Sequence, residues 1–224
     1  MKDEVLWESD RFAYMPPCEA RDGSVHRMFQ EKEATRHLPM FYRMSEEDHT
    51  ARRVNQRRTN PEGTSYFIDV VEKDGDLRDV VAVAGFRMVD RKKREAEWGI
   101  IVHPRWQRKG VCTEVFQSDM ELAKSKLGCT VVKAGTQREN TVMLSFLLRR
   151  GLKEVAFNDP WVQLEASIDD CLHNKEASSR EDKDNDEDKG SVNFRDKTDP
   201  DFALFMKMAL FACIFFMLIV PADT

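Results

Sequence analysis

The sequence predicts an α/β fold of the α+β kind, in which a mixed sheet of six or seven strands is flanked by about four helices. Strand-like and helix-like stretches alternate from residue 1 to about residue 165. Hydrophobic residues make up 41% of the 224 residues, which is enough for a domain of roughly 150 residues to bury one core. The composition changes abruptly near residue 168, so we expect one globular domain over 1–167 followed by two appendages.

The N-terminal third of the domain is expected to contain one short strand and two helices. Residues 11–15 ("RFAYM") form a strand-like run that ends at two prolines. Helical spacing follows over 25–37 and over 45–58. Ser45 is a typical N-cap for the second helix, and the three acidic residues after it suit the positive end of a helix dipole.

The rest of the domain alternates strands and helices. Residues 64–73 and 79–90 are predicted to form an antiparallel pair, because both are rich in β-branched and aromatic residues and a Gly-containing turn joins them. A third strand is expected over 94–103. The remaining expected elements are a helix over 110–127, a buried strand over 130–135, a helix over 140–150, and a last strand or hairpin over 153–166.

The two appendages have opposite character. Residues 168–200 predict an acidic, disordered linker, because the stretch from Glu176 to Lys189 has seven acidic and three basic residues and no apolar side chain larger than alanine. Residues 201–221 then predict a transmembrane helix. The 19 residues 202–220 are apolar except for Lys207, and a helix of that length is about 28 Å long, close to the thickness of a bilayer core.

The flanking charges favour a tail-anchored protein whose domain lies at the cytosolic face of a membrane, because the basic residues stand on the N-terminal side of the span. A helix packed on the domain surface is the alternative. The sequence begins without the apolar segment of a signal peptide. Five scattered cysteines without a C-x-x-C pair indicate a reducing compartment and no metal site. A net charge of −5 argues against a nucleic-acid partner.

The stretch from Trp106 to Glu114 ("WQRKGVCTE") predicts an anion-binding turn. It joins the end of an expected strand to the start of an expected helix, where unpaired backbone N–H groups and the helix dipole favour negative charge. Gly110 allows close backbone approach, and Arg108 and Lys109 add charge. A basic loop that merely precedes an ordinary helix is the alternative. The spacing matches neither of the glycine motifs for nucleoside triphosphates and dinucleotides.

Several stretches together resemble the GNAT acetyltransferases. Gln107-Arg108-Lys109-Gly110-Val111-Cys112 resembles their [QR]-x-x-G-x-[GA] acetyl-CoA turn. The context "AEWGIIVHPRWQRKGVCTEVF" is similar to the branch that acts on ribosomal-protein N-termini and polyamines. Downstream, Asn140 and Gly151 stand eleven apart, as in the family's N-x-x-[SA]-x(7)-G-F segment. The resemblance runs from about residue 8 to residue 165.

This resemblance implies acetyl-CoA as co-substrate and a set of binding residues. Ile100, Ile101 and Val102 would lie along the pantetheine arm. Asn140 would bond a cofactor amide, although a helix N-cap is an equally good reading of that residue. The backbone N–H groups that would cradle the pyrophosphate belong to Arg108, Lys109, Gly110, Val111, Cys112 and Thr113.

Glu97 is the candidate general base. Strand alternation places it on the same face as Gly99 and Ile101, which approach the expected thioester position. A solvated strand carboxylate is the alternative. Glu114 is expected to compensate the helix dipole, and His103 and the cysteines are expected to have no catalytic role.

The chain also departs from the family. Cys112 replaces a usual Gly or Ala, and the positions at which some relatives have a glutamate base and a tyrosine acid hold Gly135 and Leu147. The expected activity is transfer of acetyl from acetyl-CoA to a primary amine, namely a peptide N-terminus, a lysine or a small polyamine. The alternative is a catalytically degenerate module that binds acyl-CoA or a partner at a membrane.

Overall fold

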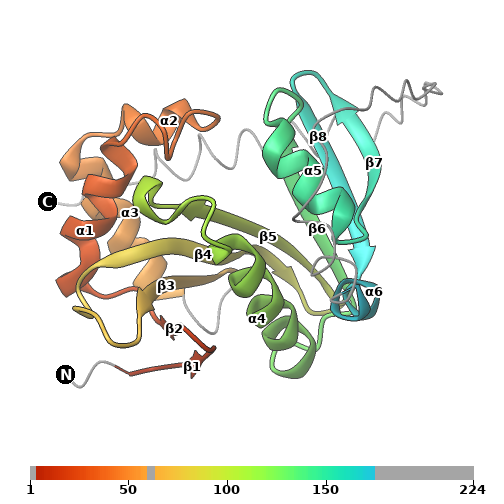
Figure 1. The fold of residues 1–224 in the computed structure, drawn as a ribbon, viewed down its shortest axis with the longest axis horizontal. Helices are drawn as coiled ribbons and strands as arrows, with labels where there is room; N and C mark the ends of the chain where they lie inside the picture. The colour runs from red at the N-terminus through yellow and green to blue at the C-terminus, as the bar shows by residue number, and fades with distance from the viewer. Residues whose placement is uncertain (1–3, 60–63, 175–224) are drawn as a thin grey trace, which may run out of the picture. The chain divides into compact units, whose positions relative to one another are not determined.

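The computed structural model describes residues 4–59 and 64–174, which form an eight-stranded mixed sheet with helices packed against it (Figure 1). The strands are β1 (Trp7–Glu8), β2 (Phe12–Met15), β3 (Tyr66–Glu72), β4 (Val80–Asp90), β5 (Glu95–Val102), β6 (Val131–Gln137), β7 (Lys153–Asn158) and β8 (Trp161–Ser167). The helices are α1 (Glu19–Gln30), α2 (Pro39–Tyr42), α3 (Glu46–Thr59), α4 (Val111–Ser125), α5 (Thr141–Arg149) and α6 (Ile168–His173), with a 3-10 turn η1 (Pro104–Trp106).

The strands lie in the order β1-β2-β3-β4-β5-β6-β8-β7, and every neighbouring pair is antiparallel except β5 and β6. Parallel neighbours need a crossover connection, because the chain must return to the end of the sheet at which the first strand began before it can start the second strand. Helix α4 is that crossover. It therefore begins beyond the C-terminal end of β5 and ends near the start of β6.

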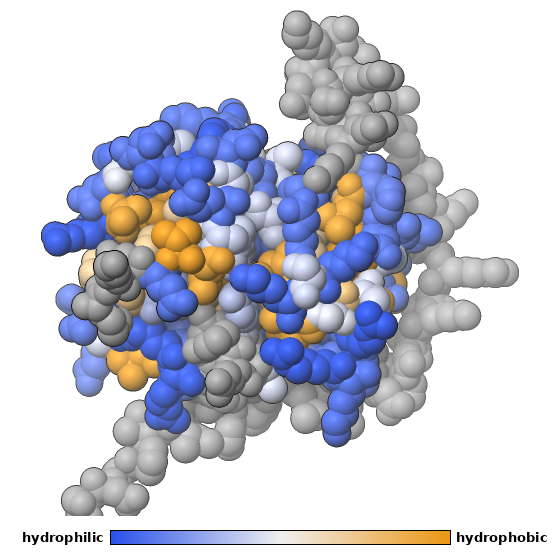
Figure 2. Space-filling model, turned by 90° about the horizontal axis from the view of Figure 1, so that it is seen from below, coloured by the Kyte–Doolittle hydropathy of each residue, from blue (hydrophilic) through white to orange (hydrophobic). Residues whose placement is uncertain are grey.

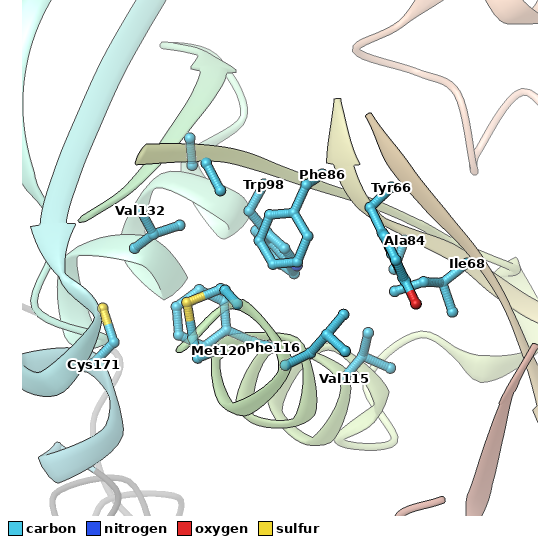
Figure 3. Close-up of a cluster of buried hydrophobic side chains, with 14 of the residues drawn as sticks. Tyr66, Ile68, Ala84, Phe86, Trp98, Val115, Phe116, Met120, Val132 and Cys171 are labelled. Atoms are coloured by element: carbon cyan, nitrogen blue, oxygen red, sulfur yellow. The ribbon is translucent and has the colours of Figure 1, made fainter. Parts of the chain in front are cut away.

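The main hydrophobic core lies between the sheet and α4 (Figure 3). Ala84, Phe86 and Trp98 point from the sheet toward α4, which presents Phe116 and Met120 to them. The rings of Trp98 and Phe116 meet edge to face with centroids 4.9 Å apart. This contact places β5 and α4, the two elements on either side of the predicted turn, in one rigid layer.

A second core lies on the opposite face of the sheet, under α1. Val83 of β4 points to this side and packs with Val25 and Phe29 of α1. Strand β4 therefore has apolar neighbours on both faces, which explains why residues 80–86 are apolar almost without interruption. The face shown in Figure 2 is mainly hydrophilic, and the apolar residues on it form separate patches.

Buried charges support the second core. Asp69 of β3 is 0% exposed and accepts hydrogen bonds from two arginines that are also buried, Arg21 of α1 at 3.1 Å and Arg53 of α3 at 2.7 and 2.9 Å. Each charge in this group has an oppositely charged partner, as a buried ion requires. The network fixes α1 and α3 on β3.

The predicted fold class and element order are confirmed, with corrections in detail. The sheet has eight strands rather than six or seven, because residues 7–8 pair with β2. The structure has six α-helices among the described residues rather than about four. The predicted helix over 25–37 had the wrong bounds, since α1 covers Glu19–Gln30. In the part of α1 that was not predicted, Arg21 is buried against Asp69.

The C-terminal boundary also differs. Residues 168–173, expected to open the linker, form α6, whose Ile168 and Cys171 are buried in the main core. The remaining linker residues and the apolar stretch over 202–220 lie outside the described residues. Within residues 4–59 and 64–174, no helix is both long enough and apolar enough to cross a membrane.

Candidate active site

The two parallel strands separate in the middle of the sheet. Strands β5 and β6 pair only as far as Trp98 opposite Ala134, and beyond this pair they diverge (Figure 1). The next residue on each strand is a glycine, Gly99 or Gly135, and both glycines are exposed. A Cβ added to Gly99 would have no atom within 4 Å. The split therefore leaves open space beside the backbone of both strands.

The part of β5 beyond the split has a free edge on the β6 side. Residues 99–102 still pair with β4 on their other side. Ile100 and Val102 pack against the main core and Ile101 against the second core, so their side chains hold the strand in place from both faces. A molecule that carries amide groups can add to such an edge as an extra strand.

The predicted turn lies where β5 ends, and its backbone is unusual. Gly110 is the N-cap of α4 with φ 74° and ψ 3°, and Arg108 also has a positive φ of 58°. Positive φ is uncommon for a residue with a side chain and is associated with ligand-binding loops. Residues 108–110 are all exposed. The turn is therefore open to a ligand from solvent.

The turn presents a run of free backbone N–H groups. The first bond of α4 runs from Glu114 N–H to the Gly110 carbonyl, at 3.1 Å. Among residues 4–59 and 64–174, no group accepts a hydrogen bond from any N–H group of residues 108–113. These donors lie at the positive end of a 15-residue helix, an arrangement that favours the binding of an anion.

Side-chain hydrogen bonds and an ion pair fix the turn and the first turn of α4. Gln107 Nε2 donates to the Val102 carbonyl at 3.2 Å, and Arg11 of the N-terminal hairpin donates to the Lys109 carbonyl at 2.9 Å. Arg11 also pairs with Glu114 at 2.7 Å, and the Ser9 hydroxyl donates to Glu114 at 2.6 Å. Arg11 and Ser9 were not among the predicted site residues. Their sequence separation from the turn is about a hundred residues, so no local pattern could reveal them.

These contacts settle the role of Glu114. Burial alone would raise the pKa of Glu114, but the hydrogen bonds from Ser9 and Arg11 outweigh burial and lower it. Glu114 is therefore an ionised structural carboxylate in the first turn of α4, as predicted. His103 also has a local role, since its Nδ1 accepts the Arg105 N–H at 3.2 Å and so caps η1.

The first three side chains of α4, which follow the turn, differ in burial. Val111 is buried in the main core, whereas Thr113 is exposed. Cys112 is partly buried and packs against the same core. Burial raises the pKa of the Cys112 thiol to about 12, so the thiol is neutral at pH 7 and is not a nucleophile. The side chains of Val111 and Cys112 are therefore directed to the core, and at these two positions only the main chain is left for a ligand.

Asn140 is the N-cap of α5, because its Oδ1 accepts the Met143 N–H at 3.3 Å. Asn140 comes three residues after the end of β6, on the side of the split where β6 diverges from β5. The side-chain NH₂ of Asn140 has no partner among the described residues. The two readings of Asn140 are thus compatible, with Oδ1 capping the helix and Nδ2 left for a ligand.

Glu97 lies one position before the last bonded pair of β5 and β6, where its neighbour in the ladder is Lys133. It is on the opposite face from the buried Trp98, as the alternation predicted. Its Oε1 accepts a hydrogen bond from Arg87, and its side chain is 16% exposed. The positions at which some relatives have a glutamate base and a tyrosine acid hold Gly135 and Leu147 here, and neither residue has a side-chain group that can accept or donate a proton.

Comparison with known proteins identifies the family. Residues 11–153, well over half of the chain, match the model of the acetyltransferase (GNAT) domain. The chain belongs to the GNAT acetyltransferase family. Members of this family are enzymes that take the acetyl group from acetyl-CoA.

Solved GNAT structures share the fold at low sequence identity. One is RimL, a ribosomal L7/L12 alpha-N-protein acetyltransferase, in complex with coenzyme A, with a TM-score of 0.62, 13% identity, and coverage of 75% of this chain and 99% of that one. A second is the Vibrio cholerae spermidine N-acetyltransferase with CoA and spermine, with a TM-score of 0.62, 12% identity, and coverage of 73% and 99%.

A third similar structure is the microcin C7 self-immunity acetyltransferase MccE with acetyl-CoA and AMP. Its TM-score is 0.58 at 13% identity, with coverage of 71% of this chain and 93% of that one. No curated protein sequence matches this GNAT chain. Among residues 4–59 and 64–174, no group of three or more His, Cys, Asp and Glu side chains is placed to hold a metal ion.

Proposed function

We propose that this GNAT protein is an N-acetyltransferase that moves the acetyl group of acetyl-CoA to a primary amine by direct attack. The observation that carries the proposal is the joint placement of the split between β5 and β6 and the turn at residues 108–113. The N–H groups of the turn would bind the pyrophosphate, and Ile100, Ile101 and Val102 would pair with the pantetheine arm. The thioester would then lie at the free edge of β5, close to Ile101 and to the split at Gly99.

The reaction needs a neutral amine and donors for the oxyanion that forms. The amine nitrogen bonds to the carbonyl carbon, the C–S bond breaks, and the CoA thiolate takes a proton from solvent. Main-chain N–H groups near Ile101 and Val102 would stabilise the oxyanion. Glu97, on the face of β5 that an acceptor can reach over Gly99, would accept the proton that the amine loses. Its bond to Arg87 would hold the carboxylate in one orientation.

A matched pair of variants tests the base. Glu97→Gln removes the carboxylate from the proposed position, and we expect kcat to fall by about 10²-fold or more with little change in acetyl-CoA affinity. Glu95→Gln is the control, because Glu95 is on the same strand and face and pairs with Lys133 at 2.7 Å. Normal turnover by the Glu97 variant, or an equal loss in both variants, would show that Glu97 is not the base.

The acceptor is proposed to be cationic before it loses its proton, as a peptide N-terminus, a lysine or a polyamine is. The net charge of −5 favours approach of such an amine. The two similar structures named for their acceptors act on a ribosomal protein and on spermidine, which supports the same range. Release of CoA thiol by the full chain over a panel of polyamines, lysine peptides and free peptide N-termini separates these classes.

The rival is a degenerate module that binds acyl-CoA without turnover, and Gly135 and Leu147 favour it. Calorimetry with acetyl-CoA and the thiol-release panel decide between them. Binding without release of thiol for any amine would establish the acyl-CoA-binding module, and absence of binding would exclude the enzyme and leave only a module that binds a partner.

We also propose that the domain is attached to the cytosolic face of a membrane through residues 202–220. The apolar length of this segment and the basic residues before it support attachment. Recovery of the full chain in the soluble fraction after carbonate extraction of cell membranes would contradict it.

A further inference from the structure

Trp161, the first residue of β8, has a ring that no other part of the domain uses. Residues 4–59 and 64–174 include all four tryptophans of the chain, and Trp7, Trp98 and Trp106 pack into the main core and make ring contacts. Trp161 belongs to neither core, and it has no ring or cation–π contact within the same residues. Its side chain is partly exposed. An unpacked indole of this kind is available to a ligand.

The indole is on the face of the sheet that carries the candidate base. Val162 is buried in the main core, so strand alternation directs the neighbouring Trp161 to the opposite face. Glu97 is on that face for the same reason, because its neighbour Trp98 is in the main core. The helices α5 and α6 pack on the main-core face, and the second core under α1 contains no buried residue of β6, β7 or β8. Neither core therefore covers this face of β6 and β8.

The register of the strands places Trp161 beside the split. Gln163 is paired with Gly135, the first residue of β6 beyond the last β5–β6 pair, and Trp161 is paired with Gln137. Two residues along β8 and one strand spacing across put the Cα atom of Trp161 about 8 Å from that of Gly135. Because β5 and β6 are parallel, Trp161 is level with Ile101, where the thioester is proposed to lie. An acceptor whose amine reaches the thioester from this face can therefore contact the indole with its next atoms.

The groups around the indole are uncharged. The neighbours of Trp161 on this face are Gln137 and Gln163, and the side-chain amides of both have no hydrogen-bond partner among the described residues. The carboxylates nearest in sequence, Glu139 and Asp159, lie in loops beyond the strand ends, farther from the split. An amide group both donates and accepts hydrogen bonds, as a peptide main chain does, whereas an ammonium group only donates. This surface therefore matches a peptide better than a chain of cations.

We propose that the acceptor is a peptide whose main chain lies over β6 and β8, bonded to the amides of Gln137 and Gln163, with a side chain packed against Trp161. This inference rests on the proposed function and narrows its range of acceptors. The reacting amine would lie over Gly135, on the face from which Glu97 can take its proton. A polyamine would instead place a second ammonium against the uncharged indole and glutamines, where no strand carboxylate receives it.

The first test compares acceptors by the release of CoA thiol from acetyl-CoA with the full chain. The four acceptors are a peptide with a free N-terminus and no lysine, an N-blocked peptide with one lysine, spermidine, and propylamine. We expect kcat/KM to be at least tenfold higher for one of the two peptides than for spermidine. The better of the two peptides shows whether the N-terminal or the lysine amine is used. Propylamine has no main chain to bind this surface and serves as the small reference acceptor.

The second test changes the surface itself. Trp161→Leu is expected to raise the KM of the preferred peptide about tenfold, because a large aromatic contact is lost, and Trp161→Phe to keep it within threefold. Gln163→Leu should raise it about fivefold through loss of one hydrogen bond. For all three variants, the Kd of acetyl-CoA and kcat/KM for propylamine should stay within twofold. Phe157→Leu is the matched control, because Phe157 is 50% exposed on the same hairpin but is paired with Val162, on the opposite face.

The other outcomes overturn the inference. A kcat/KM for spermidine as high as for both peptides would exclude a peptide-specific surface, while the acetyl transfer itself would still support the proposed function. An unchanged peptide KM in Trp161→Leu would show that the indole does not contact the acceptor. An equal loss for propylamine, or in Phe157→Leu, would indicate damage to the reaction centre or to the hairpin instead. If none of the four amines were acetylated by the unaltered chain, the proposed function would fail together with this inference.

Discussion

Gly110→Glu tests whether the turn binds a diphosphate. Gly110 has a φ of 74°, which costs a residue with a side chain about 1–2 kcal/mol. A Cβ there would meet only Arg11 Nη2, at 3.5 Å, an ordinary contact. The domain should therefore still fold, with a melting temperature lower by about 2–8 °C. At roughly 6 Å from two phosphate charges in a mostly aqueous site, the new carboxylate should cost a further 1.5–3 kcal/mol or about ten- to hundredfold in Kd.

Two controls separate the charge from the backbone cost. Gly110→Ala carries the same backbone penalty without the charge. Gly128→Glu carries both at a distant site, because Gly128 has a φ of 69° and an added Cβ would have no atom within 4 Å. Calorimetry with acetyl-CoA and a thermal melt of each variant give the two quantities. If Gly110→Glu and Gly128→Glu bound acetyl-CoA equally well, the turn would not be the diphosphate site.

Three further changes test the fold around this site. Gly85→Ala should prevent folding, because the new Cβ would lie 2.1 Å from a β3 carbonyl oxygen, and soluble expression with a cooperative melt would contradict this. Arg11→Ala should weaken acetyl-CoA binding by about fivefold in calorimetry through loss of its bond to the turn, with little change in the melt because the pair is partly exposed. Burial raises the pKa of Asp119 to about 8, so the folded protein binds this proton more tightly than the unfolded chain does. The contribution of Asp119 to the free energy of unfolding is therefore fully present below about pH 4 and is lost as pH rises from about 4 to 8. The stability of Asp119→Asn relative to the unaltered chain should therefore rise over that window, by at most about 1.4 kcal/mol per pH unit in urea titrations, and a flat difference would show that Asp119 is ionised when folded.

The local patterns in the sequence were sufficient for most of the sheet and for the turn. The predicted strands over 79–90 and 94–103 and the helix over 110–127 match β4, β5 and α4 within two residues at each end. These elements have continuous apolar runs or clear helical spacing, and both signals come from residues close together in the chain. The amide-rich turn was predictable for the same reason, since its strand, glycine and helix are contiguous.

The missed features all depend on contacts between distant residues. The start of α1 was missed because Arg21 reads as a surface residue until Asp69, 48 positions later, is placed beside it. The tether from Arg11 to the turn has the same origin.

The two halves of the proposed cofactor site have one structural cause, the crossover through α4. Because β6 runs parallel to β5, the chain must leave the C-terminal end of β5, and the N-terminus of α4 must lie at that end. The anion site and the free edge of β5 are therefore neighbours for topological reasons. Within residues 4–59 and 64–174, β5 and β6 are the only parallel neighbours in the sheet, and α4 therefore begins beyond the end of β5, close to its open edge. A ligand that has a diphosphate at one end and extended amide groups next to it could bind the N–H groups of the turn and the free edge of β5 at the same time. The two features together therefore support an acetyl-CoA site more strongly than either feature does alone.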